Sequence, residues 1–248
     1  MWRRRRTEAT VDESVARIER EYAHLFAELE ATQQRYQGLA RGVWRVQEEE
    51  RRNLARELHD ELGQLLTALI HRLERLDDER RDSCVELARE ALGRVRKLSR
   101  LLRPPVLDDL GLAAALNWLA RQAREHAELE VAVKTSAELA RVEPEIETLI
   151  YRIAQEALTN AIRHAGARRA EIELERLGNE LELRIRDDGR GFDSESLARG
   201  GATGSGIGGM RDRLALFGGT LAVRSAPGRG TEVLATLTLP DAASMTGR

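Results

Sequence analysis

The 248-residue sequence contains one cysteine, few aromatic residues and no long apolar run. A single cysteine, Cys84, cannot form an internal disulfide bond, so we expect a reducing, cytoplasmic location. The longest apolar run, LLTALI (65–70), is far shorter than the roughly 20 residues that span a bilayer. No apolar segment follows the N-terminal MWRRRR, so a signal peptide is not expected.

The sequence also has no surplus of either charge, since its formal net charge is −2. Direct binding to nucleic acid, which requires a basic surplus, is therefore not expected. The local exception is the run Arg3, Arg4, Arg5 and Arg6. These arginines could contact anionic lipid head groups at a membrane surface. A flexible, solvated N-terminus over residues 1–10 is the favoured alternative.

Residues 11–47 carry apolar residues in alternating steps of four and three. This spacing is typical of a heptad repeat and predicts a parallel coiled coil. Because such a helix has no core of its own, we expect a homodimer. The seam comprises Val11, Val15, Ile18, Tyr22, Leu25, Leu29, Thr32, Tyr36, Leu39, Val43 and Val46, of which Thr32 alone is polar.

Residues 48–103 predict a helical hairpin that dimerises into a four-helix bundle. Steps of four after Val46 indicate a stutter, which locally unwinds a coiled coil. Two apolar stripes follow, separated by the polar DDERRD (77–82), and Pro104 and Pro105 end the second helix. The first stripe comprises Leu54, Leu58, Leu62, Leu65, Leu69, Leu73 and Leu76, and the second comprises Leu87, Ala91, Val95, Leu98 and Leu101.

Residues 104–240 predict a domain of mixed composition, an α/β sandwich with helices on one face of a mixed sheet. A flexible tail is expected over residues 241–248. The chain is thus expected to combine α and α+β domains. Helices are predicted over 109–126 with Asp109 as N-cap, from Pro144, and over about 210–217, while strands are predicted over 129–135, 170–177, 181–187 and twice more near the end.

Asp187 continues the core-facing register of Leu181, Leu183 and Ile185. A carboxylate in that register is costly unless groups donate hydrogen bonds to it. Gly189 and Gly191 would let a ligand approach the backbone there. The alternative is an ordinary turn-forming aspartate at the end of the strand.

Glu156 and Asn160 lie one turn apart on the flank of a predicted helix. Their oxygens could hold a hydrated magnesium ion, although an ordinary surface pair would look the same. Arg163, three residues later, could bind a phosphate or be solvated.

The stretch GGATGSGIGGMRDR (200–213) holds six glycines among residues 200–209, directly before a helix. Glycine amides and a helix N-terminus favour a bound anion. The spacing Gly204-x-Gly206-x-x-Gly209 resembles a dinucleotide motif, but no strand precedes it and no βαβ unit follows. We therefore interpret the stretch as a flexible lid over nucleotide phosphates.

The stretch RELHDELGQ (56–64) holds a histidine beside a carboxylate. At 100° per residue, His59 lies about 80° from the centre of the first stripe, which predicts an accessible side chain. Neutral imidazole is a nucleophile near pH 7, and Asp60 could orient the ring and accept its proton. Gln64 lies one turn beyond Asp60 on the same face. Packing is the alternative role of His59.

The boxes YRIAQEALTNAIRHA (151–165), IRDDGRGFD (185–193) and GSGIGGMRDRLALFGGTLAVRSAPGRGTEV (204–233) occur in this order. Together they resemble the ATP-binding domain of gyrase-, chaperone- and histidine-kinase-type ATPases. RELHDELGQ resembles the His-Asp-x-x-x-Gln motif of two-component sensor histidine kinases of the nitrate-sensor and desaturase-regulator type. LRPPVLDDLGLAAAL (102–116) is similar to the linker of that subfamily. The resemblance covers about residues 48–240.

The resemblance implies a protein-histidine kinase with ATP and Mg²⁺ as ligands. His59 would accept the phosphoryl group, Asp60 would orient or deprotonate it, and Gln64 would position a water that dephosphorylates a response regulator receiver domain. Asn160 would bind Mg²⁺ with support from Glu156, and Asp187 would accept a hydrogen bond from the adenine amino group. The remaining ATP-binding residues would be Arg163 and His164 near the asparagine, Gly189 and Gly191 in the adenine pocket, and Gly204, Gly206, Gly208 and Gly209 in the lid.

Such kinases usually carry a membrane sensor before the coiled coil, whereas this sequence begins at MWRRRR. Input would then arrive through a cytoplasmic partner, directly at the coiled coil, or from a sensor that lies elsewhere. Two other functions stay open: an inactive coiled-coil adaptor that only binds nucleotide, and a conformational ATPase of the same superfamily.

Overall fold

The computed structural model describes residues 2–76, 81–136, 142–193 and 206–239. The chain divides into two compact units, residues 1–45 and 46–248. Residues 77–80 of the polar stretch DDERRD, residues 200–205 of the expected lid and the tail at 241–248 lie outside the described residues. Among the helices described, none is long and apolar enough to cross a membrane.

Helix α1 (Trp2–Glu57) supplies all the regular structure of the first unit. It begins at Trp2, so residues 2–10 are helical where the sequence predicts a flexible start; arginine is a good helix former and continues the helix that follows. Seam side chains such as Tyr22, Leu29 and Leu39 are exposed in the single chain. The predicted coiled coil therefore remains a prediction about a second copy.

A helical pair, which we call the hairpin, follows in the second unit: a π-helical turn η1 (Leu58–Leu62), α2 (Gly63–Leu73) and α3 (Arg81–Leu102). Its buried cluster consists of Ile70, Val85, Ala88 and Leu92, with Leu66 and Leu73 packed against it. Among the described residues of the two predicted stripes, Leu73 alone belongs to this group, and most of the other stripe leucines are exposed. The exposed members are Leu54, Leu62, Leu65, Leu69, Leu76, Leu87 and Leu98.

Two helices follow the hairpin, α4 (Pro105–Leu110) and α5 (Leu112–Ala127). Pro105 occupies the first turn of α4, where the missing amide proton of proline costs nothing. Gly111 separates the helices at a φ of 82° and is the N-cap of α5. The predicted N-cap, Asp109, is therefore wrong, since Asp109 lies inside α4.

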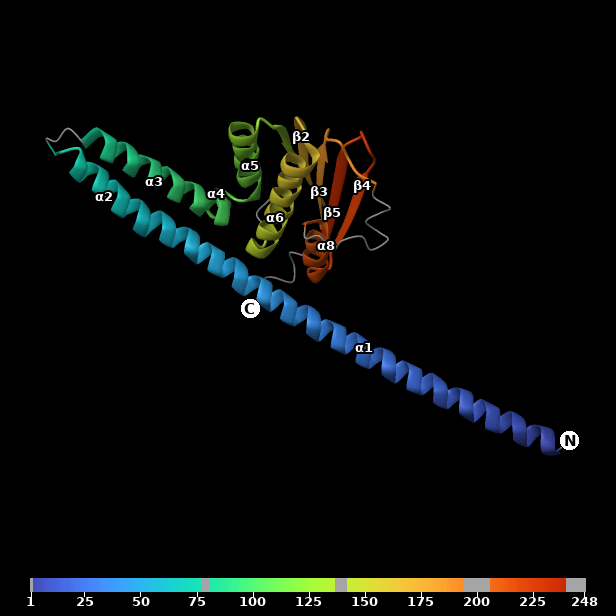
Figure 1. Ribbon diagram of the computed structural model, residues 1–248. Coiled ribbons are helices and arrows are strands. Elements are labelled where there is room, and N and C mark those ends of the chain that lie inside the picture. Colours follow the sequence, from blue (N-terminus) through green and yellow to red (C-terminus); the bar gives the residue numbers. More distant parts are fainter. Residues whose placement is uncertain (1, 77–80, 137–141, 194–205, 240–248) are drawn as a thin grey trace. The chain divides into compact units, whose positions relative to one another are not determined.

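A five-stranded sheet forms one layer of the domain predicted over residues 104–240, which we call the sandwich (Figure 1). The strands are β1 (Glu130–Thr135), β2 (Arg169–Leu177), β3 (Glu180–Asp187), β4 (Thr220–Ser225) and β5 (Thr231–Thr238). Their order is β1-β2-β3-β5-β4, with β1 and β2 parallel and every other pair antiparallel. The mixed sheet agrees with the sequence prediction.

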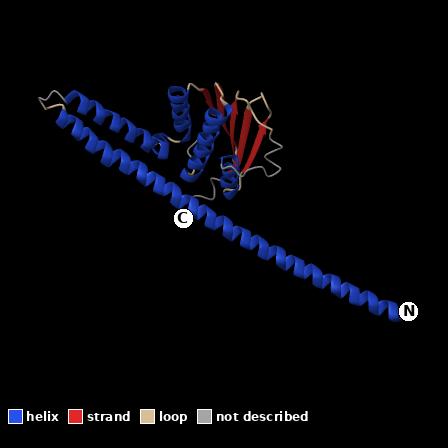
Figure 2. Cartoon of the chain, viewed as in Figure 1, coloured by secondary structure: helices blue, strands red, loops and turns tan. Residues whose placement is uncertain are grey.

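One face of the sheet is covered by α5, by α6 (Pro144–Asn160) and by α8 (Gly206–Leu216), as Figure 2 shows. Strand residues that alternate along the chain, such as Ile172 and Leu183, are buried beneath these helices. The opposite face carries charged pairs, including Arg186 with Glu232 at 2.6 Å. The sheet thus has the one apolar face that its alternating sequence predicts.

Candidate active site

His59 and Asp60 lie on the π-helical turn η1, which the sequence does not predict. The turn closes with a hydrogen bond from the backbone N–H of Gly63 to the carbonyl of Leu58, five residues earlier. Such turns insert one extra residue into a helix and often occur at functional sites.

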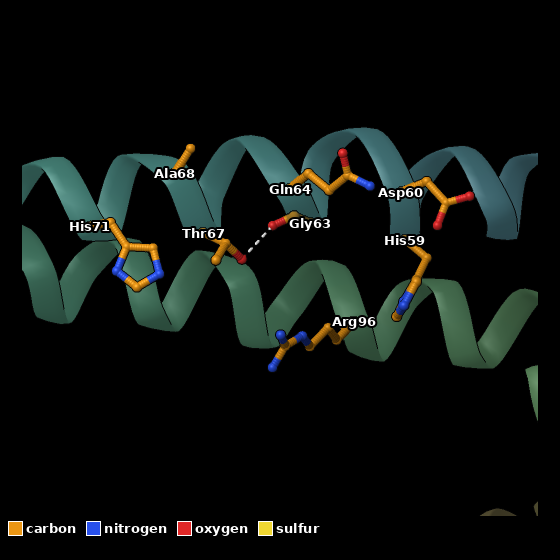
Figure 3. Close-up of a pocket in the computed structure, with 8 residues that line it drawn as sticks. All are labelled: His59, Asp60, Gly63, Gln64, Thr67, Ala68, His71 and Arg96. Atoms are coloured by element: carbon orange, nitrogen blue, oxygen red, sulfur yellow. Dashed lines mark hydrogen bonds between the residues drawn. The ribbon is translucent and has the colours of Figure 1, made fainter.

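His59, Asp60 and Gln64 are all exposed, which confirms the accessibility that the periodicity predicts for His59. A pocket of about 420 Å³ includes all three side chains. In Figure 3 the imidazole ring points toward α3, while Gln64 extends along its helix toward Asp60. Within the described residues, no hydrogen bond joins His59 to Asp60. The other lining residues are Gly63, Thr67, Ala68, His71 and, from α3, Arg96.

The second group of residues lies where α8 meets α6. A Cβ atom built on Gly206 would be 2.5 Å from Oε1 of Glu156 and 3.1 Å from Nδ2 of Asn160. A larger residue at this position would displace the Glu156 carboxylate, so the first residue of α8 lies directly against the two side chains that the sequence proposes for magnesium. Two oxygen donors leave most of an octahedral shell to water and phosphates, which is the usual mode of Mg²⁺ binding.

A second π-helical turn, η2 (Ala161–Ala165), follows directly after Asn160. It carries Arg163 and His164, whose side chains are exposed. The turn ends at Gly166, which has a φ of 60°. Neither Arg163 nor His164 forms an ion pair within the part of the chain that the structure describes, so both remain available to a ligand.

Asp187 is half-buried at the end of β3, as its register predicts. Burial raises the pKa of Asp187, while hydrogen bonds from Gly189 and Thr231 oppose this effect. The bond from the Gly189 N–H to Oδ1 measures 2.9 Å. The neighbouring Asp188 differs: its Oδ1 accepts bonds from the backbone N–H groups of Arg168 and Arg169, and hydrogen bonding from Arg169 lowers its pKa.

The glycines after Asp187 allow close backbone packing. A Cβ on Gly189 would be 2.4 Å from Cβ of Ala165, and one on Gly191 would be 2.0 Å from the carbonyl oxygen of Ala226. Gly191 also has a φ of 60°. Both glycines are therefore required for contacts within the chain itself, and their role in an adenine pocket stays a prediction. Gly208 has open space around it, and Gly204 lies outside the described residues.

The sequence interpretation misses Arg213 on α8. A Cβ on Gly209 would be 3.2 Å from Nη1 of Arg213. Burial lowers the pKa of Arg213, and the nearby carboxylate of Glu156 opposes this effect. The available signal is the spacing of four residues between Gly209 and Arg213, which places the arginine over a residue without a side chain.

A buried ion pair, also missed from sequence, joins α1 to α6. Arg152 Nη2 lies 2.8 Å from Oε2 of Glu48, and both side chains are less than 10% exposed. Arg152 also donates a 2.6 Å bond to the carbonyl of Leu102 at the end of α3. Because a buried charge requires a partner, removal of either residue would leave an uncompensated charge. These bonds tie the helix that bears Glu156 and Asn160 to the hairpin.

Comparisons with known protein families match the two segments of the chain that contain these residues. Residues 50–107 match the family "Histidine kinase", and residues 145–242 match "Histidine kinase-, DNA gyrase B-, and HSP90-like ATPase". The first segment contains His59, Asp60 and Gln64, and the second contains Glu156, Asn160 and Asp187. The ATPase family implies that the second segment binds ATP.

Two curated relatives cover most of this chain. Identity is 36% over 210 residues with "Sensor histidine kinase MctS" from Rhizobium johnstonii, covering 81% of this chain and 46% of that protein. It is 29% over 206 residues with "Signal transduction histidine-protein kinase/phosphatase DegS" from Brevibacillus brevis, covering 79% and 53%. The chain thus spans about half the length of these relatives.

A solved histidine kinase domain from the Erythrobacter litoralis EL346 blue-light activated histidine kinase is also similar. Its TM-score is 0.46 at 22% identity, and the alignment covers 77% of this chain and 94% of that one.

Proposed function

Because the chain belongs to the two-component sensor histidine kinases, we propose that it transfers the γ-phosphoryl group of ATP to its own His59. One observation carries this proposal. His59 is exposed in a pocket beside Asp60 and Gln64, in the same chain as an ATPase domain. A histidine that served packing would be buried against the hairpin core instead.

In the proposed reaction, an imidazole nitrogen of His59 attacks the γ-phosphorus of ATP. The N–P bond forms while the bond to the β–γ bridging oxygen breaks, so ADP leaves. The ring proton passes to Asp60, which is adjacent in the chain and exposed. Asn160, supported by Glu156, would hold Mg²⁺, which offsets the charge of the phosphates when bound.

The other site residues would hold the nucleotide. Asp187 would accept a hydrogen bond from the adenine amino group, because its half-buried carboxylate retains acceptor capacity beyond the bonds from Gly189 and Thr231. Gly189 and Gly191 would shape the adenine pocket through their close backbone contacts. The lid glycines Gly204, Gly206, Gly208 and Gly209, with Arg163 and His164, would lie near the phosphates.

The phosphoryl group would then pass to an aspartate of a response regulator. Gln64, one turn from Asp60, would position the water that reverses this step. Family members typically dimerise, and the exposed leucines of the hairpin support a homodimer with a four-helix bundle. The seam of residues 11–47 would continue that dimer as a coiled coil.

Incubation with γ-labelled ATP and Mg²⁺ tests the kinase proposal. The wild-type chain should acquire an acid-labile, base-stable phosphate, and His59→Gln should acquire none while its ATP affinity stays within about twofold, since the nucleotide contacts lie in another domain. His71→Gln is the matched control, because His71 lines the same pocket and is not the proposed acceptor. Labelling that survives in His59→Gln would remove His59 from this role. ATP binding without labelling of the wild type would favour the adaptor, and ATP hydrolysis without labelling would favour the conformational ATPase.

A further inference from the structure

The guanidinium of Arg213 lies over the first turn of α8. Helical side chains lean toward the N-terminus of their helix, so Arg213 points back toward Gly209, one turn earlier. A Cβ atom on Gly209 would be 3.2 Å from Nη1 of Arg213, which is tighter than ordinary contact. The guanidinium thus lies directly against the glycine, near the residue where α8 meets Glu156 and Asn160.

Arg213 forms no ion pair with a protein carboxylate within the described residues, although charged groups lie nearby. The groups whose charges act on it are Glu156, Arg51, Glu48 and Arg152. Glu48 already pairs with Arg51 at 3.0 Å and with Arg152 at 2.8 Å. Glu156 forms no ion pair within the described ranges of the chain. Nε of Arg213 is buried there without a hydrogen-bond partner.

We propose that Arg213 is a phosphate-binding residue, whose guanidinium contacts phosphoryl oxygens of bound ATP. The inference rests on the proposed ATP site. It is carried by the position of the guanidinium at the start of α8, beside the proposed magnesium ligands. A guanidinium binds phosphate through two parallel N–H donors, and this geometry distinguishes it from a diffuse positive charge. Bound phosphate would supply a hydrogen-bond acceptor for this guanidinium, whose Nε has none within the described residues.

The test compares the affinities of the full-length chain for ATP, in a non-hydrolysable form, and for adenosine by calorimetry. Arg213→Met removes the guanidinium and keeps an unbranched apolar stem for the half-buried position. Arg211→Met is the matched control, since Arg211 lies on the same helix and is exposed. We expect Arg213→Met to bind ATP about 10- to 100-fold more weakly, with adenosine affinity unchanged. Arg211→Met should stay within about twofold for both ligands.

The inference would be overturned if Arg213→Met bound ATP within twofold of the wild-type affinity, or if Arg211→Met lost as much ATP affinity as Arg213→Met. A parallel loss of ATP and adenosine affinity in Arg213→Met would also overturn it, because such a loss indicates a damaged pocket. Arg213→Lys provides a second measurement if the methionine variant unfolds. It keeps the charge and should retain adenosine affinity with an intermediate loss for ATP, whereas full ATP affinity would contradict the guanidinium contact. A wild-type chain that binds adenosine and not ATP would refute the ATP site itself, and is thereby distinguished from a failure of Arg213 alone.

Discussion

The hairpin and the sandwich differ in how completely one chain buries their apolar residues. In the sandwich, Leu149, Ile153 and Leu183 are fully buried between the helices and the sheet. In the described part of the hairpin, a cluster of four buried residues forms the core, while predicted stripe leucines such as Leu65 remain exposed. The sandwich can therefore be stabilised within one chain, whereas the hairpin presents an apolar surface that the proposed second copy would cover.

The two parts of the proposed active site fall on opposite sides of this difference in burial. His59 lies in the part whose core is incomplete, and the nucleotide residues lie in the part whose core is complete. If a second copy covers the exposed leucines, the geometry around His59 depends on that copy, whereas the geometry of the proposed adenine pocket does not. This separation would allow dimer geometry to control phosphorylation without altering nucleotide binding.

The largest effect is expected from Leu65→Asp. Leu65 and Leu177 are almost equally exposed, at 66% and 64%, but Leu65 lies on the hairpin and Leu177 at the end of β2. If a second copy covers Leu65, the carboxylate would be buried without a partner, and dimer dissociation should become about 100-fold more favourable, or about 3 kcal/mol. Sedimentation equilibrium on the full chain measures this change.

Leu177→Asp is the matched control. Its effect on the free energy of dimer dissociation should stay within about 0.5 kcal/mol, because position 177 stays in water with either side chain. Equal effects of the two substitutions would refute the assignment of the hairpin leucines to a dimer interface.

An intermediate effect is expected from Gly191→Ala in the sandwich. The new Cβ would require a positive φ and would be 2.0 Å from the carbonyl of Ala226. We expect a loss of about 2 kcal/mol in the free energy of unfolding. Gly178→Ala isolates the conformational part, since Gly178 has a φ of 65° and open space, and should cost about 1 kcal/mol. Urea unfolding followed by circular dichroism compares them, and equal costs would show that the contact with Ala226 relaxes freely.

Much of the fold follows from periodicity, because one-sided burial leaves a repeating pattern in the sequence. The alternation of Ile172 and Leu174 predicts strand β2, and the sheet places both residues in the core. The sequence is a weaker guide to which of two neighbouring faces of a helix packs inside the hairpin. Val85, Ala88 and Leu92 pack inside the hairpin, although the longer leucines of the adjacent stripe give the stronger signal.

Local backbone features were harder to predict than elements. The π-helical turns at Leu58–Leu62 and Ala161–Ala165 shift the backbone hydrogen bonds by one residue. The residues that form these turns have no composition that distinguishes them from an ordinary helix. Asp109 looks like an N-cap, yet Gly111 takes that position because Pro105 begins a separate helix earlier. The burial of Asp187 was predictable from strand register, whereas the ion pair between Glu48 and Arg152 joins residues 104 positions apart and leaves no local pattern.

The smallest effect is expected from the two adjacent aspartates at the end of β3, which serve different purposes. Asp188→Asn weakens two bonds from backbone N–H groups, at 2.8 and 2.9 Å, and should lower the free energy of unfolding by about 1 kcal/mol at pH 7. Asp187→Asn removes a carboxylate that burial disfavours, so stability should be unchanged or slightly higher, while ATP affinity falls. Urea titrations and calorimetry on both variants measure the two effects.

The pH dependence of each variant gives the sign of each contribution. The pKa of Asp188 is lowered on folding, so its contribution is present above the unfolded pKa and is lost as pH falls through the folded value. The pKa of Asp187 is raised, so its contribution is present below the unfolded pKa and is lost as pH rises through the folded value. Asp188→Asn should therefore reduce the loss of stability on acidification below about pH 4, and Asp187→Asn should reduce the loss as pH rises above about that value. If both variants shift the pH profile in the same direction, the two carboxylates do not play these opposite roles.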